Sequence, residues 1–332
     1  MAACSSTMWP LDVPEHHLVI WGITCAVLAP FIVILNVLLV YAMVKTKETS
    51  SFTSHLVICM SISDTGMGLV VMPLLCCMMF IESLRSDCVY QKAIQCIAYV
   101  FGNTSFFLLL AIGIDRYLLI TKLHNYRSFM TKFRLKIIIS TIVVVSIALA
   151  IITVTAYSYV MHLIIISSNI LCIATIYIFY AKLLLRIDKQ SASMLKEDCT
   201  SNEGKPQVSK KSRRRKRDIS VARTIRILLG TIFLLYMPYN FISSTWGYYR
   251  FEMKQDPGLA LNVTVFWTYV LMFINCMANV LIYGHGNSKI RHFVKSYSFL
   301  HAARGNFSAS RTAYDSESEI TKDDRKQQLL SQ

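Results

Sequence analysis

Two adjacent residues of opposite charge, Asp115 and Arg116, stand at the end of a long apolar stretch that begins near Ala93. Charged side chains at the edge of a membrane are costly, and they persist there when they serve function or pair with one another. An acid beside a guanidinium is suited to a contact that can be made and broken. We therefore interpret Asp115, Arg116 and the following Tyr117 as a switch at a membrane surface.

A second ionisable residue lies deeper in the apolar sequence. Asp64 is the only charged residue between Leu56 and Ile81. A carboxylate at mid-membrane depth indicates a functional site, and it needs polar partners around it. We find no nucleophile beside a base, no cysteine or histidine spacing typical of a metal site and no phosphate-binding loop. The sequence therefore predicts a protein that is not an enzyme.

The composition is that of a membrane protein. Of 332 residues, 54% are hydrophobic and only 16% are charged, whereas soluble domains carry about 25% charged residues. The net charge is +15, but the lysines and arginines gather in a few segments between apolar runs. That distribution indicates membrane orientation and contact with anionic lipid, and it argues against nucleic-acid binding.

The apolar runs predict an all-α membrane protein, a bundle of seven transmembrane helices. A spanning helix needs about 20 apolar residues. The run at residues 137–181 is free of charge and too long for one span, so we divide it near residues 156–159. The predicted spans are then residues 18–44, 54–81, 90–121, 133–155, 159–186, 219–249 and 259–284. They form a domain of residues 18–298, preceded by an N-terminal segment of residues 1–17.

The basic segments predict the orientation. They follow spans one, three and seven and precede span six, which places the N-terminus outside and the C-terminus in the cytosol of a multi-pass plasma-membrane protein. Residues 1–17 show no cleaved signal peptide. Residues 187–218 are polar and basic, and we expect a flexible cytoplasmic loop beside anionic lipid. Residues 287–298 predict a short amphipathic helix on the membrane, and residues 299–332 a disordered cytoplasmic tail.

The third span, ending in Asp115-Arg116-Tyr117, resembles that of rhodopsin-like (class A) G-protein-coupled receptors, and the other spans carry residues that fit the same pattern. Those residues are Asn36, Asp64, Tyr180, Pro238 and the stretch from Asn279 to Tyr283. The resemblance implies that Tyr180 and Tyr283 belong to the G-protein switch, and that Asp218 is the resting-state partner of Arg116. Pro238 removes a backbone hydrogen bond and predicts a hinge in span six.

The resemblance also implies a polar network around Asp64 formed by Asn36, Ser105, Asn275 and Asn279. Oxygen-bearing side chains suit a hard cation, so a sodium ion that modulates the receptor is one interpretation. A hydrogen-bonded water network is the other, because both would satisfy a buried carboxylate.

The same resemblance places a ligand pocket between the outer halves of spans three, five, six and seven. Its candidate residues are Ala98, Tyr99, Gly102, His162, Tyr239, Asn240, Ser243, Tyr269 and Phe273, with Tyr236 beneath them as a relay to the hinge. Ala98 stands where amine receptors place an aspartate, and Phe273 where opsins place their lysine. We therefore expect a neutral small molecule, a lipid-like molecule or a peptide, and neither a monoamine nor retinal. Each tyrosine is also compatible with simple packing.

Several residues depart from the class A pattern, and these departures indicate which receptor groups the chain resembles most. Tyr236 replaces the tryptophan of span six, Val280 replaces the proline of span seven, and the usual disulfide to the second outer loop has no partner cysteine. Cys88 is then either free or paired with Cys4. The short second outer loop is similar to that of melanocortin receptors, and the residues around Pro238 and Val280 are similar to those of melatonin receptors. We interpret the chain as an orphan near the melanocortin, adenosine and melatonin groups.

The sequence thus predicts a receptor that senses an extracellular ligand and activates heterotrimeric G proteins, with arrestin and receptor kinases as further partners at the tail. The alternative is a signalling-poor scaffold or partner subunit that retains the fold, which the changes at Tyr236 and Val280 favour. A transporter is disfavoured because no internal repeat is present. Of the three Asn-x-Ser/Thr sites, only Asn262 lies where N-glycosylation is compatible with the predicted topology.

Overall fold

The fold is known from a computed structural model, which describes residues 9, 12–47, 51–121, 126, 130–155, 159–200, 227, 229–286 and 290. For residues 120–121, 159, 161–162, 187–200 and 285–286 it describes the backbone alone. The chain divides into a compact unit of residues 1–286 and a second unit of residues 287–332. The helices below all belong to the first. Asp218, the predicted tail and, apart from Ile290, the predicted amphipathic helix lie outside the described residues.

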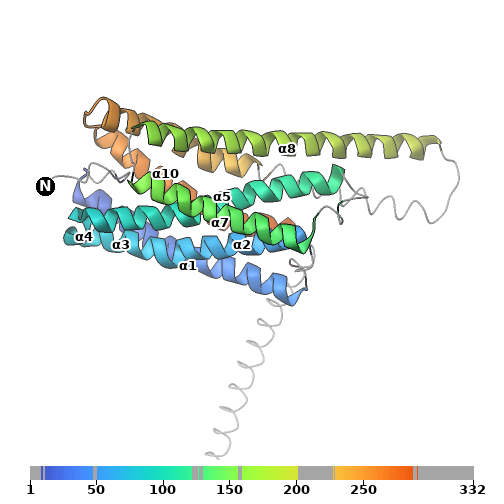
Figure 1. The fold of residues 1–332 in the computed structure, drawn as a ribbon, viewed down its shortest axis with the longest axis horizontal. Coiled ribbons are helices and arrows are strands. Elements are labelled where there is room, and N and C mark those ends of the chain that lie inside the picture. Colours follow the sequence, from blue (N-terminus) through green and yellow to red (C-terminus); the bar gives the residue numbers. More distant parts are fainter. Residues whose placement is uncertain are drawn as a thin grey trace, which may run out of the picture. The chain divides into compact units, whose positions relative to one another are not determined.

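The described part of the chain is helical and holds no strand (Figure 1). Its helices, in chain order, are α1 (Glu15–Lys45), α2 (Phe52–Gly66), η2 (Met67–Val71), α3 (Met72–Phe80), α4 (Glu82–Ser86), α5 (Cys88–Thr121), α7 (Lys132–Thr155), α8 (Tyr159–Thr200), η3 (Tyr248–Glu252) and α10 (Leu259–Gly286). Residues 229–247 are also helical. Within the described residues, six helical segments are long and apolar enough to cross a membrane.

Local sequence explains where the helices begin and end. Glu15 lies in the first turn of α1 and Lys45 in its last, which is the favourable placement for the helix dipole. Ser51 caps α2 by accepting a 3.1 Å hydrogen bond from the backbone N–H of Ser54. Pro73, near the start of α3, cannot donate to the preceding turn. The π-helix η2 immediately before it absorbs the missing hydrogen bond by widening the turn.

The helix after Tyr159 is longer than we predicted. α8 continues to Thr200, so the expectation that residues 187–200 form a flexible loop is wrong. This stretch contains neither glycine nor proline, and alanine, leucine, methionine, lysine and glutamate within it favour a helix. The first helix-breaking residues, Gly204 and Pro206, come only after α8 ends.

Burial shows which helices are central. α5 packs against α2, α7 and α8, and α1 packs against α2, α3 and α10 (Figure 1). The core is formed by apolar side chains of α1, η2, α3 and α10, together with Trp9 before α1. The helices α7 and α8 present large apolar residues such as Val144 and Leu171 at their surface, and α1 does so with Phe31. An apolar surface of this extent is expected of helices that face lipid.

Candidate functional site

Asp115 is almost fully buried near the end of α5, and two hydroxyl groups donate hydrogen bonds to its carboxylate. One comes from Thr53 in the first turn of α2, and the other from Tyr126 at 2.5 Å. Burial, and then the neighbouring Asp115 carboxylate, raises the pKa of Tyr126 well above its usual value, so this phenol remains a donor at neutral pH. Asp115 therefore ties α5 to α2 and to the segment that follows α5.

Arg116 is half-buried and lies within electrostatic reach of the hydroxyls of Tyr180 and Tyr283, on α8 and α10. Gly113 makes room for the Tyr180 ring, because a Cβ atom at this position would lie only 3.2 Å from it. Tyr117 packs edge-on against Phe179 at a centroid distance of 5.2 Å. The structure thus brings the predicted switch residues of α5, α8 and α10 together.

Asp64 is buried on α2 and is the centre of a polar cluster. Asn279 on α10 donates from its amide nitrogen to the Asp64 carboxylate at 3.3 Å, and Ser105 and Cys276 also hydrogen-bond to it. The other two residues predicted around Asp64 make different bonds. Asn36 donates to the backbone oxygen of Cys276 at 3.2 Å, and Asn275 donates to the hydroxyl of Tyr236, also at 3.2 Å.

Two buried oxygens of this cluster, Oδ1 of Asn36 and Oδ1 of Asn279, accept no hydrogen bond. Orphaned acceptors near a carboxylate would be satisfied by a donor such as water or by a cation. The residues present are therefore compatible with both interpretations of the network. In the described part of the chain no group of three or more histidine, cysteine or acidic residues could hold a metal ion.

Tyr236 connects the Asp64 cluster to the cavity described below. The centroid of its ring lies 5.2 Å from that of Phe106 on α5, and its hydroxyl accepts the hydrogen bond from Asn275. Asn275 is followed on α10 by Cys276, which bonds to Asp64, so Tyr236 and Asp64 hold neighbouring residues of one helix. Pro238 lies one half-turn further along the same helical segment as Tyr236, residues 229–247.

A cavity of about 100 Å³ is lined by Asp64 and Tyr236 and also by Trp9. Six of the nine predicted ligand-binding residues line it, namely Ala98, Tyr99, Gly102, Tyr239, Tyr269 and Phe273. Asn240 and Ser243 are buried outside its lining, and the side chain of His162 lies outside the described residues. Sequence reasoning missed the other nine lining residues: Trp9, Met67, Leu75, Gln95, Asn103, Phe106, Asn169, Met272 and Cys276.

Three tyrosine hydroxyls gather in the cavity wall. Tyr239 shares hydrogen bonds with Tyr99 and Tyr269, and also with Ser243 behind it. The ring centroids of Tyr239 and Tyr269 are 5.5 Å apart. Among the described residues of the lining, Asp64 is the only charged one. The cavity thus offers aromatic faces and neutral hydrogen-bonding groups over most of its surface, which suits an uncharged ligand.

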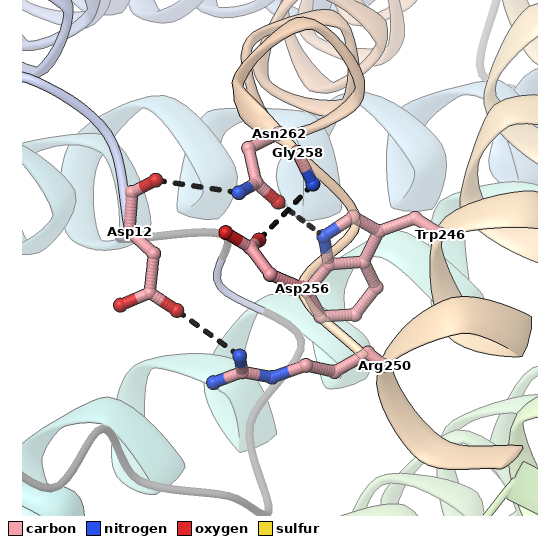
Figure 2. A network of polar contacts seen from close by, with 6 residues as sticks. All are labelled: Asp12, Trp246, Arg250, Asp256, Gly258 and Asn262. Carbon is pink, nitrogen blue, oxygen red and sulfur yellow. Dashed lines mark hydrogen bonds and ion pairs between the residues drawn. The ribbon is translucent and has the colours of Figure 1, made fainter. Parts of the chain in front are cut away.

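A polar network joins the segment before α1 to the start of α10 and the end of the preceding helix (Figure 2). The Trp246 indole donates to Oδ1 of Asn262 at 2.7 Å, and Nδ2 of Asn262 donates to the backbone oxygen of Asp12 at 3.3 Å. Arg250 pairs with the Asp12 carboxylate at 3.1 Å. Asp256 accepts from the backbone N–H of Gly258, whose φ of 83° favours glycine.

This placement corrects the predicted glycosylation of Asn262. Its side chain is 2% exposed, and the nitrogen that would carry a glycan is the one that donates to Asp12. The sequon pattern alone gives no indication of burial. The network gives Asn262 a structural role, in which it satisfies a buried indole N–H.

We expect Asn262→Ala to lower the free energy of unfolding by about 1–3 kcal/mol, because the buried N–H of Trp246 loses its acceptor. The matched control is Thr264→Ala, which destroys the same sequon at an exposed position and leaves the network intact. Thermal melting of the purified variants measures the difference. Equal melting temperatures for the two variants would contradict the structural role.

Cys88, at the start of α5, is disulfide-bonded, so the alternative of a free Cys88 is wrong. Seven other cysteines of the described region are free, among them Cys25, Cys76 and Cys276 in the core. The pairing of Cys88 with Cys4 stays a prediction, because Cys4 lies outside the described residues.

A family model, "7 transmembrane receptor (rhodopsin family)", matches residues 35–158. These residues are similar to the rhodopsin family of receptors. The matched region runs from the second half of α1 to just beyond α7 and contains Asp64, Ser105, Asp115 and Arg116. Comparison with curated proteins gives no match.

The family match and the apolar helices support a multi-pass membrane protein of the receptor type. The candidate site thus has two parts: an aromatic cavity, and a charged end of α5 bounded by two tyrosines.

Proposed function

We propose that the receptor binds an extracellular ligand in the cavity between Trp9 and Asp64 and activates heterotrimeric G proteins through Arg116. The observation that carries this proposal is the arrangement around Asp115. Thr53 and Tyr126 both donate to the Asp115 carboxylate, so this acid is already satisfied by hydroxyl groups. The neighbouring guanidinium of Arg116 does not have to neutralise it alone, and can engage a carboxylate or carbonyl of a G protein.

The proposal includes the seven-span topology, with residues 219–249 as span six, the N-terminus outside and the C-terminus in the cytosol. Residues 229–247 within that span are helical, and its apolar sequence supports the assignment. The basic segments next to the Arg116 end support the orientation. In that orientation the cavity opens toward the outside and Arg116 faces the cytosol.

The ligand class follows from the lining. Because Tyr99, Tyr239 and Tyr269 surround the cavity and Asp64 is the only charged residue in it, an uncharged aromatic molecule fits better than an amine. Ala98 in the lining offers no charge to an amine. Sodium near Asp64, and arrestin and receptor kinases at the tail, are parts of the same proposal.

The test is guanine-nucleotide exchange on purified G proteins of several classes, with and without the reconstituted receptor. We expect the receptor to accelerate exchange, either basally or with aromatic ligands from a chemical library. A receptor that reaches the cell surface but accelerates exchange on no G protein would overturn the proposal and favour the scaffold alternative.

We expect Tyr236→Phe to weaken the coupling between the cavity and the Asp64 cluster. The variant keeps the ring against Phe106 but deprives the buried amide of Asn275 of its acceptor, at a cost of about 1–3 kcal/mol. Ligand-stimulated exchange should fall more than ligand affinity. The matched control is Tyr249→Phe, where the tyrosine is 39% exposed. Equal ligand-stimulated nucleotide exchange in the two variants would show that the Tyr236 hydroxyl does not couple the cavity to the Asp64 cluster.

A further inference from the structure

Trp9 precedes the first helix, yet its side chain is buried in the core of the bundle. Its ring lies 6.4 Å from that of Trp21 on α1 and 5.5 Å from that of Tyr269 on α10. Its indole N–H donates to the backbone oxygen of Gln91 on α5 at 3.3 Å. Three helices therefore contact one side chain from the N-terminal segment, and this side chain lines the cavity proposed as the ligand site.

The chain is fixed again three residues later, at Asp12. The backbone oxygen of Asp12 accepts from Asn262, which is buried, and its carboxylate pairs with Arg250. The ion pair is partly exposed and contributes little by itself. The bond to Asn262 is part of the network that also holds Trp246, so the position of Asp12 is set by the core (Figure 2).

We propose that Trp9 is a built-in occupant of the cavity, an intramolecular ligand whose indole an external, uncharged aromatic molecule of similar size must displace. This inference rests on the proposed function, in which the cavity is the ligand site. It specifies both the ligand chemistry and the regulation of that site.

The contacts of Trp9 are those expected for a bound ligand rather than for a lining residue. A lining residue belongs to the helix that carries it, whereas Trp9 reaches α5 and α10 from a segment outside the helices. Its partners are a backbone carbonyl and aromatic rings, which a free indole could use equally well. A tethered group has a high effective concentration, so a free competitor must bind tightly or be abundant.

The experiment is thermal melting of the full-length receptor, reconstituted in nanodiscs of phosphatidylcholine and phosphatidylserine, with added indole. Trp9→Ala opens a space shaped for indole, and such apolar cavities bind small aromatic molecules. We expect this variant to melt several degrees lower than wild type and to recover at least half of the loss with indole. Wild type should respond little, because its own indole occupies the site.

The matched control is Trp267→Ala on α10, where the tryptophan is 47% exposed. It removes the same side chain without opening the cavity, and indole should not affect it. The compound 1-methylindole lacks the N–H that meets the Gln91 carbonyl, and it should rescue Trp9→Ala less well than indole. If Trp9→Ala does not fold by itself, it is produced with indole present, and loss of the folded receptor when indole is removed reports the same rescue.

Three results would overturn the inference: no loss of melting temperature in Trp9→Ala, a loss that indole does not reverse, or equal indole effects on all variants. Melting does not involve a G protein, so the outcome is separate from the proposed function. Indole rescue without nucleotide exchange would support the built-in occupant and refute G-protein activation. Nucleotide exchange without indole rescue would support the proposed function and refute the built-in occupant.

Discussion

Arg116→Ala should reduce receptor-catalysed nucleotide exchange by at least roughly 10-fold while leaving the amount of receptor at the cell surface unchanged. Truncating one partner of a desolvated, charge-assisted contact commonly costs 2–5 kcal/mol or more, which corresponds to a loss of this size or larger. The fold should survive, because Thr53 and Tyr126 continue to satisfy the buried carboxylate of Asp115. The measurement is exchange per surface receptor, in cells or nanodiscs.

Two controls make the result specific. Arg116→Lys keeps the charge but loses the planar set of five donors, so it should retain only part of the activity. Lys136→Ala removes the same charge from an exposed position on α7 and should change exchange little. Undiminished exchange in Arg116→Ala at matched surface density would show that the switch does not act through this arginine.

The structure also explains why Asp115 and Arg116 should behave differently on substitution. Removing the Asp115 carboxylate leaves the buried hydroxyl of Thr53 and the half-buried hydroxyl of Tyr126 without this acceptor. The side-chain bond between α5 and α2 is lost, which lowers stability. Removing the Arg116 side chain takes away a half-buried cation that lies near tyrosine hydroxyls. One residue of the pair holds the helices, and the other is available to a partner.

Local features of the sequence were enough to predict the charged and polar centres of the site. Asp64 and Asp115 are conspicuous because carboxylates are rare in apolar runs, and the spacing of those runs predicts the helices around them. The tyrosines of the cavity were implied by the family resemblance and by no local pattern. Six of the nine ligand-binding residues that the resemblance implies line one cavity.

The features that the sequence did not predict depend on contacts between distant segments. Nothing in the sequence around Trp9 indicates that this side chain is buried in the core, since the residues before α1 show no periodic apolar pattern. The burial of Asn262 depends on Trp246 and Asp12, which lie in two other segments. The extension of α8 to Thr200 was missed for a different reason: polar composition was taken to indicate a loop, although the residues favour a helix.

Tyr236 illustrates how a departure from the family pattern is accommodated. A tryptophan at this position would present an indole N–H, whereas the tyrosine presents a hydroxyl that can accept as well as donate. The structure uses the accepting capacity, since Asn275 donates to it. The position next to the hinge therefore remains joined to α10, and the change from tryptophan does not by itself disconnect the cavity from the Asp64 cluster.

Asp64→Asn should lower basal nucleotide exchange several-fold and abolish any effect of sodium on it. The carboxylate accepts hydrogen bonds from Asn279, Ser105 and Cys276, all of which act as donors. An asparagine places an amide NH₂ where one carboxylate oxygen was, so at least one donor loses its acceptor and the negative charge disappears. Coupling energies between sites are typically 1–3 kcal/mol, which sets the expected range at roughly 5- to 150-fold.

Sodium and water are distinguished by replacing sodium chloride with N-methyl-D-glucamine chloride at constant ionic strength. An ion bound among Asp64, Ser105 and the orphaned oxygen of Asn279 should raise the melting temperature of wild type in sodium alone. Asp64→Asn should show no such increase. Ser105→Ala is the matched control, because it removes one neutral donor and keeps the charge, so part of the sodium effect should remain. Identical melting of wild type in the two salts would assign the cluster to water, since a bound ion must stabilise the state that binds it.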